Sequence, residues 1–399
     1  MTARYLRDVS ETSRRCLGPA AVSIALTVWA TAALGATLVV DPDGPIRTVA
    51  EAARIAHDGD VVEIRSGEYR GDVAVWLQKR LTIRGVGPTP PVMRADGRSA
   101  EGKAIWVLRS GSFDVENVAF EGARVPDLNG AGIRFERGRL TLRRCRFIDD
   151  ENGVLTGNDA ASELTVEDSE FAHAPRDRGP LKHLLYVGRI ARFSVTGSRF
   201  HDAFEGHLIK SRARESYVAY NLLYDDAGGK AGYELEFPDG GAAYVVGNVI
   251  GQSATTTNRA VVAYGAEGSY WDANALYVSH NTLLSDLETG TAFLRVWRDR
   301  PTPTRVVAIN NLTVGRGSFA PAAGDRFQGN RALPRAAMRD ARTLDFRLGR
   351  RSPLRGAGVA PPAIAGHSLA PDAEFALPLG TRPIRRPRVW TPGAFQTAK

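Results

Sequence analysis

The stretches LTLRRCRF (140–147), LTVEDSEF (164–171), FSVTGSRF (193–200) and YVAYNLLY (217–224) repeat one alternating pattern of apolar and polar residues. The same pattern recurs with successive starts 24 to 33 residues apart, in FDVENVAF (113–120), YVVGNVIG (244–251), YVSHNTLL (277–284) and VAINNLTV (307–314). Each copy is too short and too rich in β-branched residues for a helix. The chain is therefore expected to consist of short strands that return at a regular interval.

A second strand recurs with similar spacing, in GIRFE (132–136), GVLTG (153–157), LLYVG (184–188), LIKSR (208–212), ELEFP (234–238), VVAYG (261–265) and FLRVW (293–297). Two strand columns that each advance by one irregular coil predict an all-β right-handed parallel β-helix. Stacked asparagines can hydrogen-bond along such a column, and the fifth position of the first pattern holds Asn221, Asn248, Asn281 and Asn311. A propeller or sandwich would need tight two-residue hairpins, which are not found.

The segment DPDGPIRTVAEAARIAHDGDVVEIRSGEYRG (41–71) predicts a strand, an amphipathic helix over 48–56, a turn and another strand. Such a helix can cover the open hydrophobic end of a solenoid. With this cap in front of its coils, the chain resembles the pectate-lyase-like β-helix superfamily over about residues 41–359. The resemblance implies the fold. It does not choose the reaction, because the superfamily includes lyases, hydrolases, esterases, epimerases, phage spikes and adhesins.

Three regions are expected along the chain. Residues 1–35 have the layout of a signal peptide, with arginines followed by an apolar run and the small residues ALGA (33–36). An uncleaved anchor is the alternative, because the run is near the ~18 residues that span a membrane. Residues 36–359 would form the β-helix with its cap, and the Pro- and Arg-rich residues 360–399 an extended strap or a disordered tail. This organisation predicts a secreted or periplasmic protein without a stable membrane span after signal cleavage.

The charge distribution bears on the class of partner, and the cysteine content bears on disulfide bonds. The formal net charge of +8 divides into +2 for residues 1–35, +7 for residues 347–399, and −1 for the remainder. Because the basic excess lies in the predicted signal and tail, a nucleic-acid partner is not expected. The chain holds only Cys16 and Cys145, and Cys16 would leave with the signal, so no internal disulfide is expected.

The second strand column assigns side chains to faces. Its outward positions are Arg134, Leu155, Tyr186, Lys210, Glu236, Ala263 and Arg295. Coils stack about 4.8 Å apart, so Tyr186, Lys210 and Glu236 should form an outward ladder. Arg212 and Glu234 are expected on the same face. These residues would be either a solvated charged surface or the floor of a saccharide groove, where Trp297 and His183 would also contact the sugar.

The enzyme hypothesis is a lyase or epimerase that acts on an acidic polysaccharide. Lys210 or Tyr186 would serve as base or acid, Arg212 would neutralise a carboxylate, and His207 would assist. Glu236 favours the charged form of Lys210 and so opposes its use as a base. His183 and His207 precede equivalent strands, where they could stack for acid–base chemistry, bind a metal, or cap turn backbones.

Two further motifs bear on a cation. EGHLIKS (205–211) resembles the lysine motif of the alginate and chondroitin-B lyase group, which implies Glu205 as a Ca²⁺ ligand and Lys210 as the catalytic base. This chain departs from that motif at Ala203, where the second calcium carboxylate would stand, and at Glu236, near which an arginine is expected. The polar residues at 149–152 and 158–159 could hold a cation or a sugar, or form polar turns.

The rival hypothesis is a non-catalytic carbohydrate-binding or cell-surface structural solenoid. Both hypotheses take a polysaccharide as the partner, and both expect a monomer, because the charged face offers no apolar stripe for a trimer. A groove over Tyr186 and Lys210 would favour the enzyme. A flat face with Lys210 paired to Glu236 would favour the binding solenoid.

Overall fold

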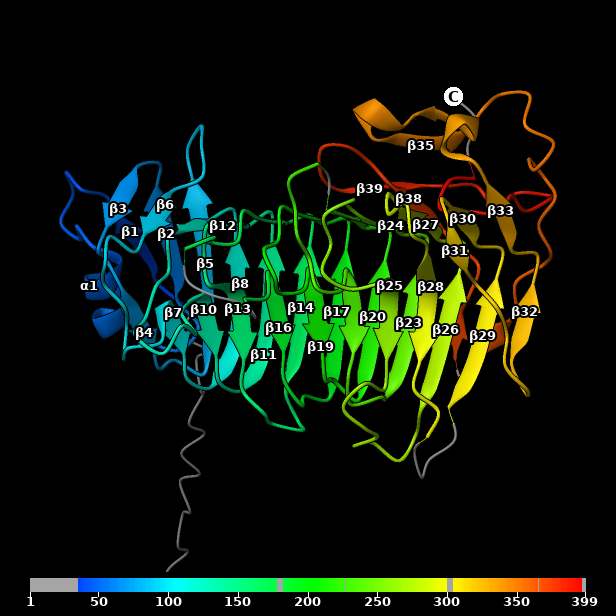
Figure 1. The fold of residues 1–399 in the computed structure, drawn as a ribbon. Helices are drawn as coiled ribbons and strands as arrows, with labels where there is room; N and C mark the ends of the chain where they lie inside the picture. Colours follow the sequence, from blue (N-terminus) through cyan, green and yellow to red (C-terminus); the bar gives the residue numbers. More distant parts are fainter. Residues whose placement is uncertain (1–34, 178–181, 226, 300–303, 365, 397–399) are drawn as a thin grey trace, which may run out of the picture. The chain divides into compact units, whose positions relative to one another are not determined.

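Three parallel sheets run along the coiled chain, and successive coils add one short strand to each (Figure 1). The computed structural model describes residues 35–177, 182–225, 227–299, 304–364 and 366–396. Neighbouring strands of one sheet are joined through the other two sheets, and such parallel crossovers are right-handed. The predicted right-handed parallel β-helix is therefore confirmed.

The three sheets are named by their strands. Sheet A contains β1 (Thr37–Val40), β2 (Val61–Arg65), β5 (Arg80–Val86), β8 (Gly111–Glu116), β11 (Gly138–Arg143), β14 (Glu163–Glu167), β17 (Arg192–Thr196), β20 (Glu215–Ala219), β23 (Ala242–Val246), β26 (Ala275–Ser279), β29 (Arg305–Ile309) and β32 (Arg326–Gln328). Sheet B contains β3 (Glu68–Arg70), β6 (Val92–Arg94), β9 (Ala119–Glu121), β12 (Arg146–Ile148), β15 (Glu170–Ala172), β18 (Arg199–His201), β21 (Leu222–Tyr224), β24 (Val249–Gln252), β27 (Thr282–Ser285), β30 (Leu312–Val314) and β33 (Arg331–Leu333). Sheet C contains β4 (Ala74–Trp76), β7 (Ala104–Leu108), β10 (Ala131–Phe135), β13 (Asn152–Thr156), β16 (Leu185–Val187), β19 (Ile209–Ser211), β22 (Leu235–Phe237), β25 (Ala260–Tyr264), β28 (Thr291–Val296) and β31 (Gly317–Ser318).

The repeated pattern spans one strand of sheet A, a sharp turn, and one strand of sheet B. Its last position points into the coil and places four phenylalanines in one file: Phe120, Phe147, Phe171 and Phe200. Their rings stack at centroid distances of 5.1, 4.7 and 4.7 Å. The sheets therefore enclose a core in which each coil packs on the next through equivalent side chains.

The asparagine column at the turn between sheets A and B is confirmed. The Oδ1 atom of each asparagine accepts a hydrogen bond from the backbone N–H of its counterpart one coil earlier, through Asn221, Asn248, Asn281, Asn311 and Asn330. Ser169 and Ser198 continue the column on earlier coils with their hydroxyls. The column satisfies buried backbone donors at each turn.

The predicted helical cap is α1 (Val49–Ile55). Thr48 is its N-cap and accepts a hydrogen bond from the Glu51 backbone N–H at 3.1 Å. The carboxylate of Asp72 accepts two more hydrogen bonds, from the backbone N–H groups of Val49 and Ala50 in the first turn. Val49 and Ala52 are fully buried, so the apolar face of α1 covers the first coils as expected.

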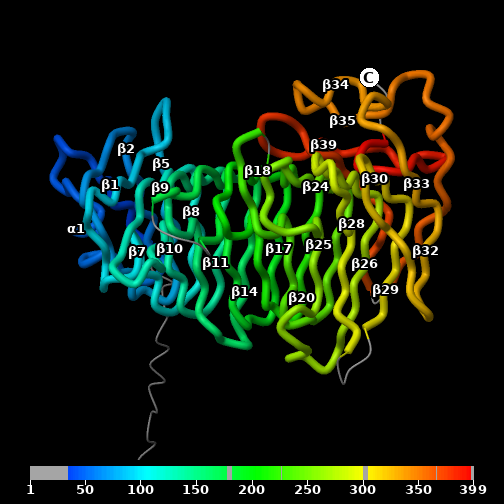
Figure 2. Tube along the Cα trace, in the orientation of Figure 1, coloured from blue at the N-terminus to red at the C-terminus, as the bar shows by residue number. Residues whose placement is uncertain are grey.

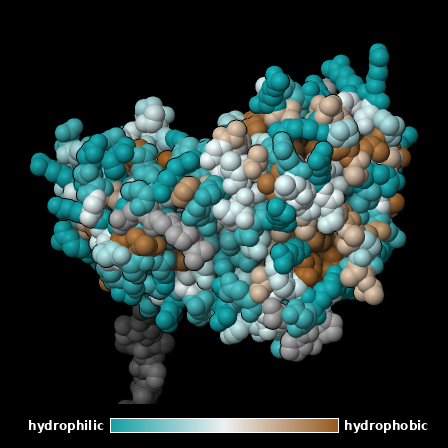
Figure 3. Space-filling view, in the orientation of Figure 1, coloured by the Kyte–Doolittle hydropathy of each residue, from teal (hydrophilic) through white to brown (hydrophobic). Residues whose placement is uncertain are grey.

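Residues 360–364 and 366–396 follow the last coil as an extended strap. The segment runs back along the outside of the C-terminal half of the coils and includes β36 (Ala363–Ile364), β37 (His367–Ser368), β38 (Ala373–Phe375) and β39 (Thr381–Pro383) (Figures 1 and 2). Asp372 accepts a hydrogen bond from the Tyr220 hydroxyl at 2.8 Å, and the backbone N–H of Gly380 reaches the Gly197 carbonyl at 2.7 Å. On the face seen in Figure 3, hydrophobic residues gather mainly toward this end.

The predicted signal or anchor at residues 1–35 lies outside the described residues except for its last position. Over the described ranges, every helix is too short or too polar to span a bilayer. Cys145 is buried and unpaired among the described residues.

Candidate functional site

The outward ladder of sheet C has the predicted register. Arg134 pairs with Leu155, Leu155 with Tyr186, and Tyr186 with Lys210, which pairs with Glu236. These side chains are much less exposed than the alternation alone suggests: relative exposure is 5% for Leu155, 9% for Lys210 and 3% for Glu236. Glu267, from the loop after β25 (Ala260–Tyr264), contacts Lys210 Nζ at 2.8 Å, so this part of the ladder is covered rather than open.

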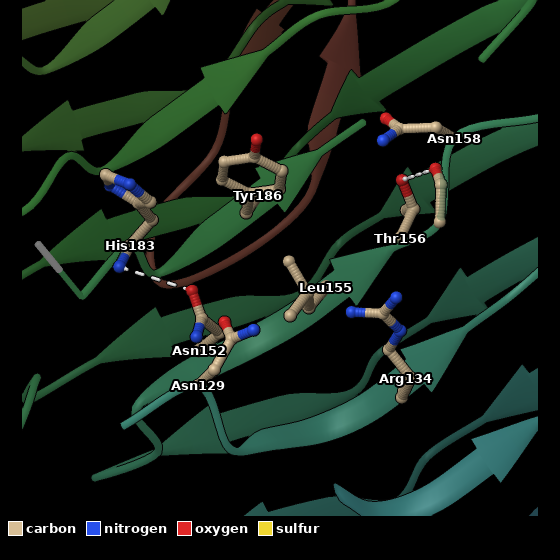
Figure 4. Close-up of a pocket in the computed structure, with 9 residues that line it drawn as sticks. Asn129, Arg134, Asn152, Leu155, Thr156, Asn158, His183 and Tyr186 are labelled. Carbon is tan, nitrogen blue, oxygen red and sulfur yellow. Dashed lines mark hydrogen bonds between the residues drawn. The ribbon is translucent and has the colours of Figure 1, made fainter. Parts of the chain in front are cut away.

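A pocket of about 360 Å³ lies over the N-terminal part of this ladder (Figure 4). Arg134, Leu155 and Tyr186 line it from β10, β13 and β16 (Figure 4). Polar groups line its two ends, and they come from Asn129, Asn152 and His183 at one end and from Thr156, Gly157 and Asn158 at the other. We call this the Tyr186 pocket.

The Tyr186 pocket carries one formal positive charge and, among its described lining residues, no acidic one. The charge belongs to Arg134, whose Nε lies 3.4 Å from Glu136 Oε1. Glu136 also binds Lys103 Nζ at 2.9 Å. Burial raises the pKa of Glu136, but the two cations outweigh this effect and hold it below the usual value. Lys103 also lies 3.9 Å from Glu101 Oε2. The described lining itself holds a cation and no carboxylate, which favours an anionic ligand in the pocket.

The rings of His183 and His207 lie against each other on adjacent coils, with centroids 4.6 Å apart and planes tilted by 39°. His183 Nδ1 accepts the backbone N–H of His207 at 3.1 Å, and His207 Nδ1 accepts that of Tyr233 at 3.1 Å. Both rings therefore cap turn backbones, one of the predicted alternatives. Burial, reinforced by His207, Lys210 and Arg212, holds the pKa of His183 well below its usual value.

The tautomer of His183 follows from these contacts. Because Nδ1 is an acceptor and the ring is neutral, the proton is on Nε2. This Nε2–H has no hydrogen-bond partner among the described residues, and His183 lines the Tyr186 pocket. His183 is thus a neutral hydrogen-bond donor available to a ligand.

Tyr186 and Arg212 are brought together as a pair. Arg212 Nε donates to the Tyr186 hydroxyl oxygen at 2.8 Å, and the guanidinium lies 5.8 Å from the centre of the tyrosine ring. Arg212 also binds Asp239 and, through Nη2 at 2.6 Å, Glu267. Arg212 is therefore fully engaged and acts on a ligand only through Tyr186.

Lys210 is held by two carboxylates. Its Nζ lies 2.8 Å from Glu267 Oε1 and 3.2 Å from Glu236 Oε2, and it does not line the Tyr186 pocket. Glu236 Oε2 in turn lies 3.0 Å from His207 Nε2. Burial raises the pKa of Glu236, but His207 and Lys210 outweigh it and the net pKa is lowered. Lys210, Glu236 and His207 form a buried ionic cluster.

The prediction that Glu234 is exposed on the outward face beside Glu236 is wrong. Glu234 is fully buried at the turn that leads into β22. Burial, with Asp225 nearby, raises the pKa of Glu234 well above its usual value. Glu234 lies just before β22 begins at Leu235, so the strand alternation does not determine its exposure.

Glu205 and Trp297 lie apart from the pocket. Glu205 pairs with Lys230 Nζ and belongs to no group of three potential metal ligands among the described residues. Ca²⁺ takes six to eight oxygen ligands, of which Glu205 would supply at most two, and calcium at this position stays a prediction. Trp297 lies under the Arg295 guanidinium at 4.5 Å, three coils beyond Arg212.

Several pocket and cluster residues were not identified from the sequence as site residues. Glu267 sits on the loop after β25, which folds back so that its backbone N–H donates to the Pro238 carbonyl at 3.0 Å. This loop lies in the longest repeat interval, between positions 244 and 277, and that length was the available signal. No local pattern marks Asn129 or Asp239. Of the polar stretch at 149–152, Asn152 lines the pocket, whereas Asp150 and Glu151 accept loop backbone N–H groups.

Comparison with solved structures finds a similar fold in a pectate lyase. Pectate lyase Pel9A matches with a TM-score of 0.63 and 12% identity over 91% of this chain and 96% of that protein. A PL6 family alginate lyase, AlyGC, matches with a TM-score of 0.41 and 18% identity over 75% of this chain and 40% of that one. A tailspike protein of Acinetobacter baumannii bacteriophage Fri1, a capsular polysaccharide depolymerase, matches with a TM-score of 0.41 and 12% identity over 75% of this chain and 62% of that one. No family model and no curated protein matches the chain. The resemblance to the pectate-lyase-like superfamily is confirmed at the level of the fold.

Proposed function

We propose that this chain acts on an acidic extracellular polysaccharide, and that it holds one uronate residue in the Tyr186 pocket for β-elimination. The observation that carries this proposal is the set of groups that line one pocket: a cation, three amides, a neutral histidine donor and a tyrosine. The full-length likeness to a pectate lyase supports the choice of substrate class. Of the two predicted acid–base residues, Lys210 and Tyr186, only Tyr186 is among the described residues that line this pocket.

Each lining group has a role in this reaction. Arg134, with the amides of Asn129 and Asn152, would bind the uronate carboxylate and stabilise the negative charge that develops when the C5 proton leaves. His183 Nε2–H would donate to a sugar oxygen. Leu155 offers an apolar contact for the sugar ring.

Tyr186 would be the acid–base group. Once deprotonated, its oxygen is stabilised by Arg212 Nε at 2.8 Å and can take the C5 proton. The C–H electron pair forms the C4–C5 double bond while the bond from C4 to the glycosidic oxygen breaks. The leaving oxygen takes a proton from the Tyr186 hydroxyl or from water. An epimerase would begin with the same proton abstraction and return a proton to C5 instead.

The rival function is a binding solenoid without turnover, and the engagement of Lys210 favours it. A lysine whose Nζ contacts two carboxylates is a structural ion pair rather than a free base. Under this alternative, the same pocket would bind the polysaccharide and leave it unchanged.

The test is the ultraviolet absorbance of the unsaturated uronate during incubation with a panel of uronate polysaccharides. Tyr186→Phe removes the oxygen that would carry the proton, and we expect it to lower the rate by about 10²–10⁴-fold. Tyr270→Phe is the matched control, because Tyr270 is exposed and lies outside the pocket. We expect this control to leave the rate unchanged.

Other outcomes discriminate between the alternatives. Deuterium incorporation at C5 without an absorbance rise would identify an epimerase. The third outcome is polysaccharide binding with neither an absorbance rise nor deuterium incorporation. If Arg134→Gln weakened that binding, the chain would be a binding solenoid and not an enzyme. A rate that survives in Tyr186→Phe would overturn the assignment to this pocket.

A further inference from the structure

Two histidines and a carboxylate converge on the outer side of sheet B, away from the Tyr186 pocket residues. His173 follows β15, and Asp202 follows His201 at the end of β18. Ala172 pairs with His201 in the register, so His173 and Asp202 are stacked neighbours on adjacent coils. Among the described residues, this is the group in which three potential metal-ligand atoms lie within 4.8 Å of one another.

The ligand atoms already face each other. Asp202 Oδ2 lies 2.7 Å from His201 Nδ1 and 3.2 Å from His173 Nδ1. Zinc bonds of about 2.0–2.1 Å place tetrahedral ligand atoms about 3.3 Å apart. The 3.2 Å separation is near that value, and the 2.7 Å separation would widen through a side-chain rotation to admit an ion.

The far side of His201 is oriented by a second carboxylate. Glu170 Oε1 lies 3.2 Å from His201 Nε2, and Arg146 Nε donates to Glu170 Oε2 at 2.9 Å. A carboxylate that accepts one ring N–H of a histidine fixes the ring and leaves the other nitrogen for a metal. Here that other nitrogen is Nδ1, which faces Asp202 and His173.

The same turn on neighbouring coils lacks such a donor set. At the equivalent position one coil earlier, Asp149 pairs with Arg124 Nη2 at 2.7 Å. One coil later, the Asp225 carboxylate oxygens accept the backbone N–H groups of Ala203 and Ala231. The convergence of His173, His201 and Asp202 is therefore a property of these residues and not of the repeat.

We propose that His173, His201 and Asp202 bind a divalent transition-metal ion of the zinc class, with Glu170 as the carboxylate that orients His201. Two imidazoles and one carboxylate suit Zn²⁺ better than Ca²⁺ or Mg²⁺, which prefer oxygen ligands. The side chain of His173 is 58% exposed, so the fourth coordination position faces solvent. The site is independent of the function proposed for the Tyr186 pocket.

The test measures metal bound to the full-length protein after chelator treatment and dialysis. Incubation with Zn²⁺ should leave one ion per chain by elemental analysis, and Co²⁺ should give the visible absorption of a nitrogen- and oxygen-bound ion. His173→Ala and Asp202→Asn should abolish retention. Glu170→Gln should weaken affinity by about 10–100-fold, as expected for an orienting partner.

A matched control excludes adventitious binding. His57 is exposed, and its Nδ1 lies 3.9 Å from Asp60, so it forms a histidine–aspartate contact with no third potential ligand among the residues that the structure describes. His57→Ala should retain the full complement of zinc. An equal loss in His57→Ala, retention in His173→Ala and Asp202→Asn, or no retention by the unmodified protein would overturn the proposal. Because His173 is exposed, His173→Ala is expected to fold, and circular dichroism would verify this.

Discussion

At the scale of single residues, the outer face of sheet C contains charges that are buried because they are paired. Glu236 is 3% exposed and contacts both His207 Nε2 and Lys210 Nζ. Removing one member of a buried ion pair is strongly destabilising, since the partner keeps its charge without compensation. Loss of a single member of this cluster is therefore expected to destabilise the middle of the solenoid.

We expect Glu236→Gln to lower the free energy of unfolding at pH 7 by about 3 kcal/mol, because Lys210 would keep only the more exposed Glu267 as a partner. Urea denaturation measures this change. The control is Glu63→Gln, which removes a surface pair with Arg84 and should cost less than about 1 kcal/mol.

The difference in the free energy of unfolding between the wild type and Glu236→Gln should depend on pH in one direction. The folded pKa of Glu236 lies below its ordinary value of 4.5, so its contribution is present above pH 4.5 and is lost as the pH falls through the folded pKa. The difference between the wild type and Glu236→Gln should shrink in acid. A difference that stays constant down to pH 3 would contradict this account.

At the scale of elements, the asparagine column links sheets A and B along the C-terminal coils. Asn248 accepts two hydrogen bonds from Asn221 and donates to the Val218 carbonyl and to Asn281, and it is fully buried. Each buried partner that loses its hydrogen bond carries a desolvation penalty of about 1–3 kcal/mol. The middle of the column is therefore its most sensitive part.

We expect Asn248→Ala to destabilise the protein by about 3 kcal/mol or more, measured by urea denaturation. Asn330→Ala, at the less buried end of the column, should cost about 1 kcal/mol, because water can replace the lost bond. Asn248→Ser should fall between them, since Ser198 fills the equivalent position with a hydroxyl acceptor. Equal losses for Asn248→Ala and Asn330→Ala would refute the role assigned to burial.

At the scale of the whole described chain, the strap covers apolar side chains on the outer faces of sheets A and B. Leu369 and Ala373 pack with Tyr244, Tyr277 and Ile309. Phe375 and Ala394 pack in a second cluster with residues of sheet B and of the segment near β35 (Asp345–Leu348). The C-terminal coils thus depend on a segment that follows them in sequence.

We expect deletion of residues 360–399 to expose these clusters. The truncated protein should bind the dye ANS and unfold at a lower urea concentration, because each uncovered large apolar side chain forfeits about 1.5–3 kcal/mol. Asp372→Ala removes the carboxylate oxygen that accepts from the Tyr220 hydroxyl, keeps the backbone N–H contact with that hydroxyl, and should have a smaller effect. An unchanged urea midpoint without dye binding would show that the strap is dispensable for stability.

The sequence by itself determined the solenoid, its register and its cap. Alternation and repeat length are local, and the asparagine and phenylalanine files follow once coils stack at a constant interval. It also placed Tyr186, Lys210 and Glu236 in one ladder. The burial of that ladder, the Tyr186 pocket and the partners of Lys210 were decided only by tertiary structure. Irregular loops carry Asn129, Asp239 and Glu267 to the sheet, and no periodicity determines where an irregular loop folds back.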